Sequence, residues 1–312
     1  MNASTAVLRL EYDGNFRNFP DSVFVKCCKG GRDFVCDSEF LYYTRDYAGL
    51  RDAPIPKCFD AKFSRSTGDY HLVLEDLSSS HYSNKDVAPS LESALTFSTE
   101  LARLHAFRWG KLSDEIGTDK NSSSQLERFY AEVQKGLPPI MNALSSDFPL
   151  LWRDAIDHIF DKHIALMMRR THFLPGHTLI HGDANPTNVL SPILQTEKTF
   201  IIDRQPFSWS ITYWLGVYDL IYGTIPFWDI GDRRRFERQV LQRYHEALIK
   251  FGVTDYPWEN CLSDYRLCIA HGVFVAVSWG IDQAEMQQMR WLWTLQLERS
   301  LTAFFDWECD NL

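Results

Sequence analysis

Two carboxylates and an amide in this chain stand at spacings that suit the transfer of a phosphoryl group. The segment from His181 to Asn188 reads His-Gly-Asp-Ala-Asn-Pro-Thr-Asn, and an apolar run further along ends at Asp203. A carboxylate on a loop can accept the proton of an attacking hydroxyl. A nearby amide and a second carboxylate can hold magnesium against nucleotide phosphates. The pattern therefore indicates Asp183 as the base and Asn188 and Asp203 as metal ligands.

The same octet has a simpler interpretation as a polar β-turn, because Gly, Asp, Asn and Pro commonly form turns. The run Thr199–Ile202 argues against this reading. An apolar, β-branched strand that ends on an acid suits the delivery of that acid to a site. Together with Asn188, the octet and this strand are expected to form a hairpin-like pair around one metal ion.

Lys26 lies within the apolar stretch Val23–Cys27, where a strand would bury its neighbours. A buried ammonium needs a counter-ion. Glu39, on a predicted helix that follows, can supply it, and the pair would then hold the phosphates of a nucleotide. The alternative is an edge-strand lysine on a solvated face.

The strand end at Leu72–Leu77 is a candidate for adenine binding. Its backbone can offer the donor and acceptor that an adenine edge needs, while Leu74 and Leu77 would cover the ring faces, although an ordinary strand end fits equally well. Glu75 and Leu77 are the cofactor-binding candidates of this segment. Asp219 is expected to be structural, because a buried acid must be hydrogen-bonded and the backbone of the His181 loop is a suitable partner. His181 itself is expected to support the loop rather than to transfer a proton.

The order of patterns predicts an α+β fold with two lobes. Residues 1–77 indicate a small β-rich N-terminal lobe, the polar residues 78–88 an inter-lobe connection, and residues 89–312 a larger, mainly helical lobe. In the first lobe we expect three strands and one helix, at Ala6–Tyr12, Ser22–Cys28, Tyr70–Glu75 and Asp33–Tyr47. In the second lobe we expect helices near residues 91–109, 123–135, 147–170, 213–227, 232–251, 258–280 and 283–307.

Composition narrows the class of protein. The chain has 312 residues, 45% of them hydrophobic and 14% aromatic, which is typical of a globular enzyme-sized protein. A net charge of −9 argues against a nucleic-acid or anionic-membrane surface. Seven cysteines without a Cys-x-x-Cys pair argue against a zinc site or a disulfide framework. We expect no membrane span, because no apolar segment approaches the roughly 20 residues required, and we expect a cytoplasmic location.

These motifs resemble the aminoglycoside phosphotransferase and choline kinase superfamily, most closely its ecdysteroid-kinase-like branch of small-molecule kinases. The matching residues are Val25-Lys26, Glu39, Leu74–Leu77, Leu101–His105, His181-Gly182-Asp183 with Asn188, Ile202-Asp203 and Tyr218–Leu220. The resemblance implies a bilobal protein-kinase-like fold. It also implies an enzyme that uses ATP and Mg to phosphorylate a hydroxyl group of a small molecule.

The chain departs from the family pattern at two places. Arg204 follows the second metal acid, where the family usually has an aromatic or similar apolar residue. Only Met1–Thr5 precede the first expected strand, and Gly14 is the only glycine before Lys26, so most of the phosphate-covering loop is expected to be absent. We therefore predict weak ATP binding, and a catalytically weak or silent nucleotide- or metabolite-binding protein remains the alternative function.

Two further questions concern the acceptor. A protein kinase is disfavoured, because the chain has no Asp-Phe-Gly or Ala-Pro-Glu and only 15 residues separate Asp203 from Asp219. In the family, the acceptor pocket lies between the catalytic loop and the C-terminal helices. In this chain those helices carry Trp279, Asp282, Glu285, Trp291 and Trp293. They could bind a cationic substrate, although Trp at helical spacing is more often part of a core. The sequence does not indicate an oligomeric state.

Overall fold

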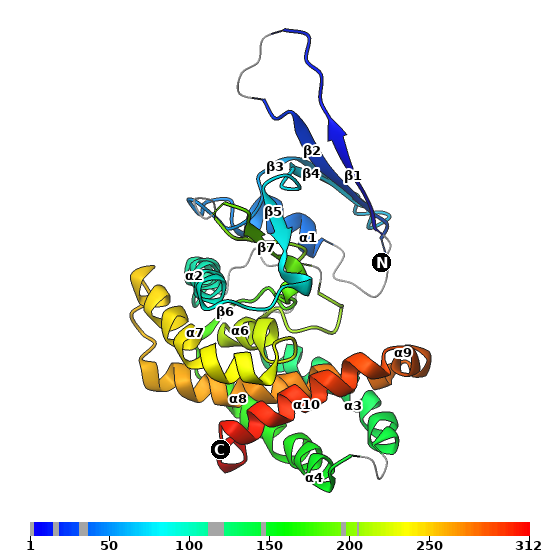
Figure 1. The fold of residues 1–312 in the computed structure, drawn as a ribbon, viewed down its shortest axis with the longest axis vertical. Helices are drawn as coiled ribbons and strands as arrows, with labels where there is room; N and C mark the ends of the chain where they lie inside the picture. The colour runs from blue at the N-terminus through cyan, green and yellow to red at the C-terminus, as the bar shows by residue number, and fades with distance from the viewer. Residues whose placement is uncertain are drawn as a thin grey trace.

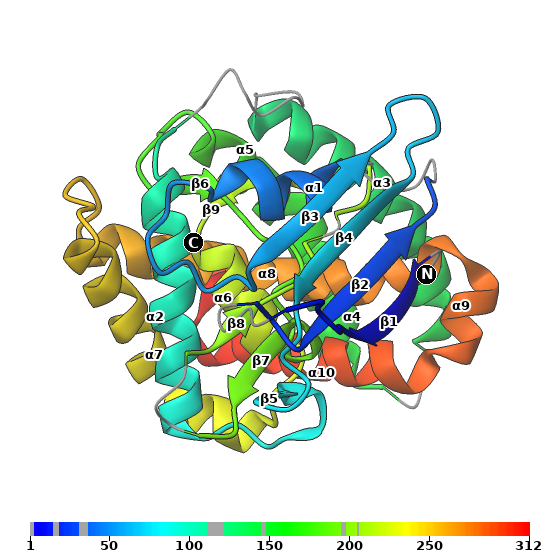
Figure 2. The same cartoon turned by 90° about the horizontal axis from the view of Figure 1, so that it is seen from above.

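A four-stranded antiparallel sheet dominates the smaller lobe of the computed structural model, in the order β1-β2-β4-β3 (Figure 1). The strands are β1 (Ala3–Arg9), β2 (Ser22–Cys28), β3 (Cys58–Phe63) and β4 (Tyr70–Glu75). Helix α1 (Ser38–Leu41), which continues into the π-helical turn η1 (Tyr42–Asp46), lies beside this sheet (Figure 2). The structure describes residues 3–14, 19–30, 37–111, 122–144, 148–194, 198–204 and 206–312.

The sheet follows the apolar pattern of its central strands. The predicted bounds of β2 and β4 are confirmed, and β4 alternates buried and half-buried residues along its length. The first strand begins at Ala3 rather than Ala6 and ends at Arg9, because its register with β2 runs from Ala3 opposite Cys28 to Arg9 opposite Ser22. The prediction placed this strand too late in the sequence, because the side chains of β1 are mostly exposed and their burial does not alternate.

Other elements of the small lobe also differ from the prediction. Strand β3 was missed: it lies exposed at the sheet edge, and the charged residues Asp60 and Lys62 interrupt its apolar sequence. The predicted helix Asp33–Tyr47 is present as the two short segments α1 and η1, which end at Asp46. Its first residues, 33–36, lie outside the described part of the chain.

Two small sheets belong to the rest of the described chain, and one of them joins the larger lobe to the segment after β4. One has the order β5-β7-β8, formed by His81–Ser83, Val189–Pro192 and Phe200–Ile201. The other pairs β6 (His177–Leu179) with β9 (Tyr213–Leu215). The polar segment 78–88 therefore contains the strand β5, which pairs with β7 of the larger lobe.

Helices make up most of the larger lobe. Their bounds are α2 Leu91–Arg108, α3 Ser122–Ala143, α4 Leu150–His158, α5 Ile164–Arg170, α6 Val217–Thr224, α7 Ile230–Lys250, α8 Trp258–Ser278, α9 Gln283–Gln288 and α10 Arg290–Asp306. The stretch predicted at 147–170 is divided by the π-helical turn η3 (Ile159–His163), and that predicted at 213–227 begins with the strand β9. The 3-10 turns are η2 Asn84–Asp86, η4 Pro186–Asn188, η5 Trp279–Ile281 and η6 Cys309–Asn311.

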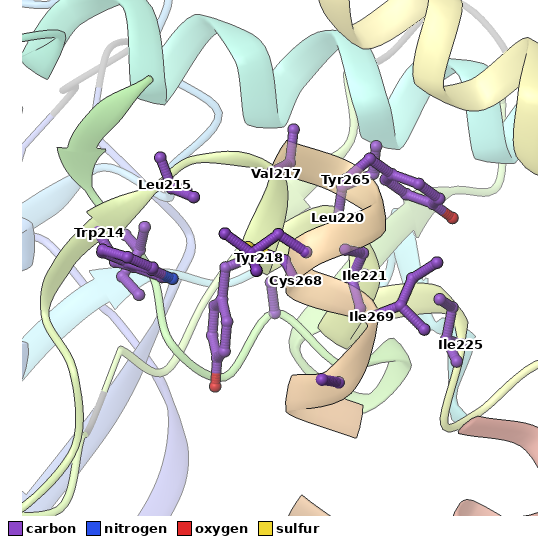
Figure 3. Close-up of a cluster of buried hydrophobic side chains, with 14 of the residues drawn as sticks. Trp214, Leu215, Val217, Tyr218, Leu220, Ile221, Ile225, Tyr265, Cys268 and Ile269 are labelled. Carbon is purple, nitrogen blue, oxygen red and sulfur yellow. The ribbon is translucent and has the colours of Figure 1, made fainter. Parts of the chain in front are cut away.

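Helix α8 is the centre of the core. Figure 3 shows its Tyr265, Cys268 and Ile269 among side chains of the α6 segment, including Leu220 and Ile221. All five are at most 1% exposed. Gly272 of α8 faces Ser300 of α10, and a Cβ at Gly272 would lie 2.5 Å from the Ser300 Oγ, so glycine is required for this close approach. Helix α6 therefore rests on a closely packed, apolar support.

The segment Trp258–Ile281 is, by length and composition, the one helical segment of the described residues that could cross a membrane. The expectation that no apolar segment approaches this length is therefore wrong. Its most apolar window is 72% buried within the fold. Two of its charged residues have partners inside the lobe: Asp264 pairs with Arg170 at 2.7 Å, and Arg266 donates to the carbonyl of Trp307 at 2.9 Å. The length of the apolar run reflects the central place of α8 in the core.

The buried His271 of α8 gives a testable pH dependence. Neither ring nitrogen has a hydrogen-bond partner among the described residues, and the ring packs against Phe129, Trp214 and Phe274. Burial, assisted by His163, lowers the pKa of His271 from 6.5 to about 3. The unfolded chain therefore binds this proton at higher pH than the folded protein does, and stability falls as the pH drops below about 6.5.

We expect the variant His271→Phe to lose about 2 kcal/mol less stability than the parent between pH 6.5 and pH 4.5. Urea unfolding at the two pH values measures this difference. His172→Phe, at an exposed position, is the control and should keep the parental pH dependence. An unchanged pH dependence in the His271 variant would show that this imidazole does not titrate between the folded and unfolded states.

Candidate active site

Lys26 lies in the interior strand β2, where its side chain points away from water. It is 6% exposed, and its Nζ lies 2.7 Å from Glu39 Oε1 and 2.6 Å from Asp203 Oδ1. Burial lowers the pKa of Lys26, but the two carboxylates more than offset burial, so its pKa lies above the ordinary value. The ammonium therefore stays charged between two acids from distant parts of the chain.

Glu39 is positioned by helix α1 and by the sheet. Its side chain is 2% exposed, and Oε2 accepts a hydrogen bond of 2.5 Å from Tyr70 Oη on β4. Burial raises the pKa of Glu39, while Lys26 and Tyr70 oppose this shift. The predicted pair of Lys26 and Glu39 is thus present, with Tyr70 as a third member.

Asp219 holds the loop that carries Asp183. Its two carboxylate oxygens accept the backbone N–H groups of His181 at 2.5 Å and Gly182 at 2.8 Å, and it also contacts His105 Nε2 at 3.0 Å. Burial alone would raise the pKa of Asp219, but its hydrogen bonds with His105 and with the backbone of Gly182 help to hold it below the ordinary value. This is the structural role that the sequence predicted for Asp219.

His181 supports the loop, also as expected. Its Nδ1 accepts the N–H of Asp183 at 3.3 Å, and its Nε2 lies 3.0 Å from the carbonyl of Ile202. Burial lowers the pKa of His181 to about 4. At neutral pH the ring is therefore uncharged, with Nε2–H donating to Ile202.

The approach of helix α6 to this loop requires glycine at position 223. A Cβ there would lie 2.6 Å from the carbonyl oxygen of Ala184 and 2.8 Å from Phe97. Asp219 lies one helical turn before Gly223, and this spacing places it next to the backbone of His181. Tyr222 of the same helix hydrogen-bonds the Asp183 carboxylate. Helix α6 thus contacts the loop at successive residues from His181 to Ala184.

Asp183 is half-buried and accepts only from neutral donors among its described neighbours. Oδ1 accepts from Asn185 Nδ2 at 2.6 Å and Oδ2 from Asn188 Nδ2 at 3.1 Å, in addition to the bond from Tyr222. Burial raises the pKa of Asp183 to about 6, although these hydrogen bonds lower it. A carboxylate with such a pKa is ionised at neutral pH and remains basic enough to take a proton.

The ladder between β7 and β8 brings Asn188 and Asp203 together. Val189 lies opposite Ile201, and the N–H of Ile202 donates to the carbonyl of Asn188 at 2.9 Å. Asp203 follows with a φ of +63°, a left-handed conformation that is uncommon for a residue with a side chain. This turn directs Asp203 out of the strand and toward Lys26.

The oxygens of Asn188 and Asp203 suit a magnesium ion. The Nδ2 of Asn188 faces Asp183, which leaves its Oδ1 without a hydrogen-bond partner among the described residues. The ammonium of Lys26 contacts Oδ1 of Asp203. The other oxygen of Asp203, Oδ2, has no hydrogen-bond partner in the described part of the chain. Magnesium prefers oxygen donors and keeps several waters, so one carboxylate and one amide oxygen are a suitable protein contribution.

The predicted adenine-binding strand end has a defined geometry. The N–H of Glu75 donates to the carbonyl of Lys57 at 2.8 Å, and the carbonyl of Leu77 accepts from the N–H groups of Ser80 at 3.1 Å and His81 at 2.9 Å. That carbonyl therefore belongs to a turn. The assignment of Glu75 and Leu77 to adenine stays a prediction.

A cavity of about 790 Å³ lies next to the Asp183 loop. Pro186 and Thr187 of that loop line it, together with Phe227, Trp228 and Trp291 of the helical lobe. The ring of Phe227 lies 5.9 Å from that of Tyr222, which hydrogen-bonds Asp183. An aromatic wall therefore connects the cavity with the predicted base.

The five residues proposed for a cationic pocket do not form one. Trp279 and Trp293 direct their indole N–H groups into the lobe, toward Gln296 Oε1 at 2.9 Å and the carbonyl of Met286 at 3.0 Å. Asp282 caps α9. Trp291, which is 64% exposed, is the one of the five that lines the cavity. Two of the three Trp residues of this set, Trp279 and Trp293, therefore contribute to the packing of the helical lobe.

The sequence did not predict the roles of Tyr70 and Tyr222 or the contact between Lys26 and Asp203. Tyr70 shares a strand face with the buried Leu72 and Leu74, and Tyr222 lies one helical turn after Asp219. Both periodicities were readable and could have placed the phenols near the site. The contact of Lys26 with Asp203 spans 177 residues and left no local signal.

Residues 39–252 match the ecdysteroid kinase-like family, and the chain belongs to that family. No curated protein sequence matches the chain. Among solved structures, a choline kinase from Cryptosporidium parvum aligns with a TM-score of 0.53 at 9% identity, covering 99% of this chain and 89% of the other. An ethanolamine kinase from Plasmodium vivax aligns with a TM-score of 0.51 at 11% identity, covering 91% and 77%.

A thermostable mutant of an aminoglycoside phosphotransferase, in a ternary complex with AMP-PNP and hygromycin B, aligns with a TM-score of 0.50 at 12% identity, covering 90% and 87%. At such identities these likenesses show the fold. The bilobal protein-kinase-like fold and the family expected from the motifs are therefore confirmed. The family and the neighbours support a small-molecule kinase as the class of enzyme.

The buried pair of Lys26 and Glu39 should behave as a coupled unit. Lys26→Met leaves Glu39 and Asp203 without their cation, so we expect a loss of about 3–5 kcal/mol of stability. Glu39→Gln should cost less, because Asp203 still neutralises Lys26. The double variant should cost less than the sum of the single variants, as urea unfolding would measure.

The exposed pair of Glu132 and Lys135, with Nζ and Oε1 2.6 Å apart, is the matched control. Its single variants, Lys135→Met and Glu132→Gln, should each cost less than about 1 kcal/mol. Strictly additive losses at Lys26 and Glu39 would contradict the coupling.

Proposed function

We propose that this protein is an ATP- and Mg-dependent phosphotransferase that phosphorylates a hydroxyl group of a small molecule. The observation that carries the proposal is the convergence of Lys26, Asp183, Asn188 and Asp203 on one site from both lobes. Phosphoryl transfer depends mainly on positioning and on charge stabilisation, with little covalent chemistry for the protein to perform. These four side chains supply both requirements.

In this proposal each residue has one role. Lys26, fixed by Glu39, binds the phosphates of ATP, and the strand end at Glu75 and Leu77 contacts the adenine. Asp183 accepts the proton of the acceptor hydroxyl at a carboxylate oxygen. Asn188 and Asp203 would hold Mg, which when bound would neutralise charge on the phosphates.

The cavity beside the Asp183 loop is the proposed acceptor site. It is bounded by Thr187 on the loop and by Trp228 and Trp291 on the helical lobe, and Tyr222 links its wall to Asp183. The volume of about 790 Å³ is within the usual range of small-molecule sites. The named activities of the structural neighbours, on choline, ethanolamine and an aminoglycoside antibiotic, all involve small molecules that carry hydroxyl groups.

The direct test is incubation of the purified chain with ATP, Mg and a panel of hydroxylated metabolites. Formation of ADP together with an acceptor product that is heavier by one phosphoryl group, detected by mass spectrometry, would support the proposal. Binding of Mg-ATP without any product across the panel would favour the alternative, a nucleotide-binding protein with little or no activity.

Asp183→Asn should lower kcat by about 100-fold or more, because the amide cannot accept the hydroxyl proton. The affinity for Mg-ATP should stay within a few-fold of the parent, since the base acts on the acceptor. Steady-state kinetics and calorimetry measure the two quantities. Asp161→Asn, at an exposed position in η3, is the control. Near-normal turnover of the Asp183 variant would remove this residue from the mechanism.

Asp203→Asn should instead change the dependence on Mg. Loss of one charged ligand should raise the Mg concentration needed for half-maximal ATP binding by about tenfold. Calorimetric titration of ATP at a series of Mg concentrations gives this midpoint. The Asp183→Asn variant serves as the comparison, because it should leave the midpoint unchanged. An unaltered midpoint in the Asp203 variant would exclude Asp203 from the metal site.

A further inference from the structure

Arg204 follows Asp203 directly and is 3% exposed. Its guanidinium donates through Nε to the carbonyl of Ile180 at 3.0 Å and through Nη1 to Ser38 Oγ at 2.6 Å. No carboxylate among the described residues forms an ion pair with it. Buried polar groups are retained where their hydrogen bonds are satisfied, so these two bonds define where the side chain is held.

Each partner of Arg204 adjoins a functional segment. Ser38 immediately precedes Glu39 at the start of α1, and Ile180 immediately precedes the loop from His181 to Asp183. Arg204 itself adjoins Asp203. One guanidinium therefore connects the segments that carry Glu39, Asp183 and Asp203, although the segment with Glu39 is distant in the sequence from the other two.

The turn that follows α1 strengthens the same connection. Tyr42 Oη donates to the carbonyl of Ile201 at 2.8 Å, and Tyr43 Oη accepts the N–H of Asp203 at 3.3 Å. The ring of Tyr42 also meets that of His181 edge-on, with centroids 5.6 Å apart. Asp203 has a left-handed backbone conformation, and such a conformation persists only where its surroundings fix it.

In protein kinases, a phenylalanine occupies the position after the metal-binding aspartate, and its packing sets the active or inactive state. An apolar ring in a core can repack between positions, whereas a guanidinium that forms two directional hydrogen bonds is held in one geometry. We propose that Arg204 is a positioning residue that fixes α1, the Asp183 loop and Asp203 in one arrangement. The effect on catalysis rests on the proposed phosphotransferase function.

The test compares Arg204→Met, Ser38→Ala and the double variant. Arg204→Met replaces the guanidinium with an unbranched apolar side chain and removes both hydrogen bonds, so kcat/KM for ATP should fall roughly tenfold or more, with both kcat and KM affected. Ser38→Ala should give a smaller decrease in the same direction. The double variant should match Arg204→Met, because the Ser38 hydroxyl acts through Arg204.

Arg153→Met is the matched control. Arg153 also donates to two backbone carbonyls, those of Met141 at 2.9 Å and Leu144 at 2.7 Å, but it lies in the helical lobe and has no contact with the site residues. Its kcat/KM should stay within about twofold of the parent. Equal decreases in the Arg153 and Arg204 variants would reduce Arg204 to a general stabilising residue and overturn the proposal.

Amide hydrogen exchange separates this proposal from the proposed function. In Arg204→Met, amides of both segments 38–46 and 180–188 should exchange faster than in the parent, whether or not the protein transfers phosphate. If Arg204→Met fails to fold, the exchange of 38–46 in Ser38→Ala decides. Unchanged exchange in both segments, or additive kinetic effects of the two substitutions, would overturn the role of Arg204.

Discussion

The buried ammonium of Lys26 is the interaction on which the site depends. An isolated charge in this position would be strongly unfavourable, so the fold must bring acids to it. It does so with Glu39 from α1 and Asp203 from the end of β8, at 2.7 and 2.6 Å. Because one acid belongs to each lobe, the same ion cluster that satisfies Lys26 also sets the spacing of the lobes at the site.

Backbone hydrogen bonds determine the rest of the geometry. The ladder of β7 with β8 places Asn188 beside the residue that precedes Asp203, and Asp219 accepts two N–H groups of the loop that carries Asp183. A buried carboxylate that accepts backbone N–H groups stabilises one loop conformation, since losing it would leave those donors unsatisfied. Helix α6 can supply it because glycine at position 223 permits the close approach.

The sequence predicted those parts of the fold that have a local pattern. Strands β2 and β4, helix α2 and the loop around Asp183 were readable because periodicity or close spacing identifies them. Strand β3 and strand β5 were not, since β3 is an exposed edge strand interrupted by Asp60 and Lys62, and β5 has only three residues. The partners of Lys26 illustrate the same limit: Glu39 is near in sequence and was found, while Asp203 is 177 residues away and was not.

The four acids of the site differ in their partners, and this difference assigns their chemistry. Glu39 and Asp203 contact the cation Lys26, and Asp219 accepts two backbone N–H groups besides its contact with His105. These contacts tie each of the three carboxylates to a cation or to the backbone. Asp183 alone has only neutral amide and phenol donors among the described residues, and burial raises its pKa to about 6. Of the four carboxylates, Asp183 is therefore the one that neither neutralises a lysine nor holds the backbone in place, and this difference supports the proposal that Asp183 is the base.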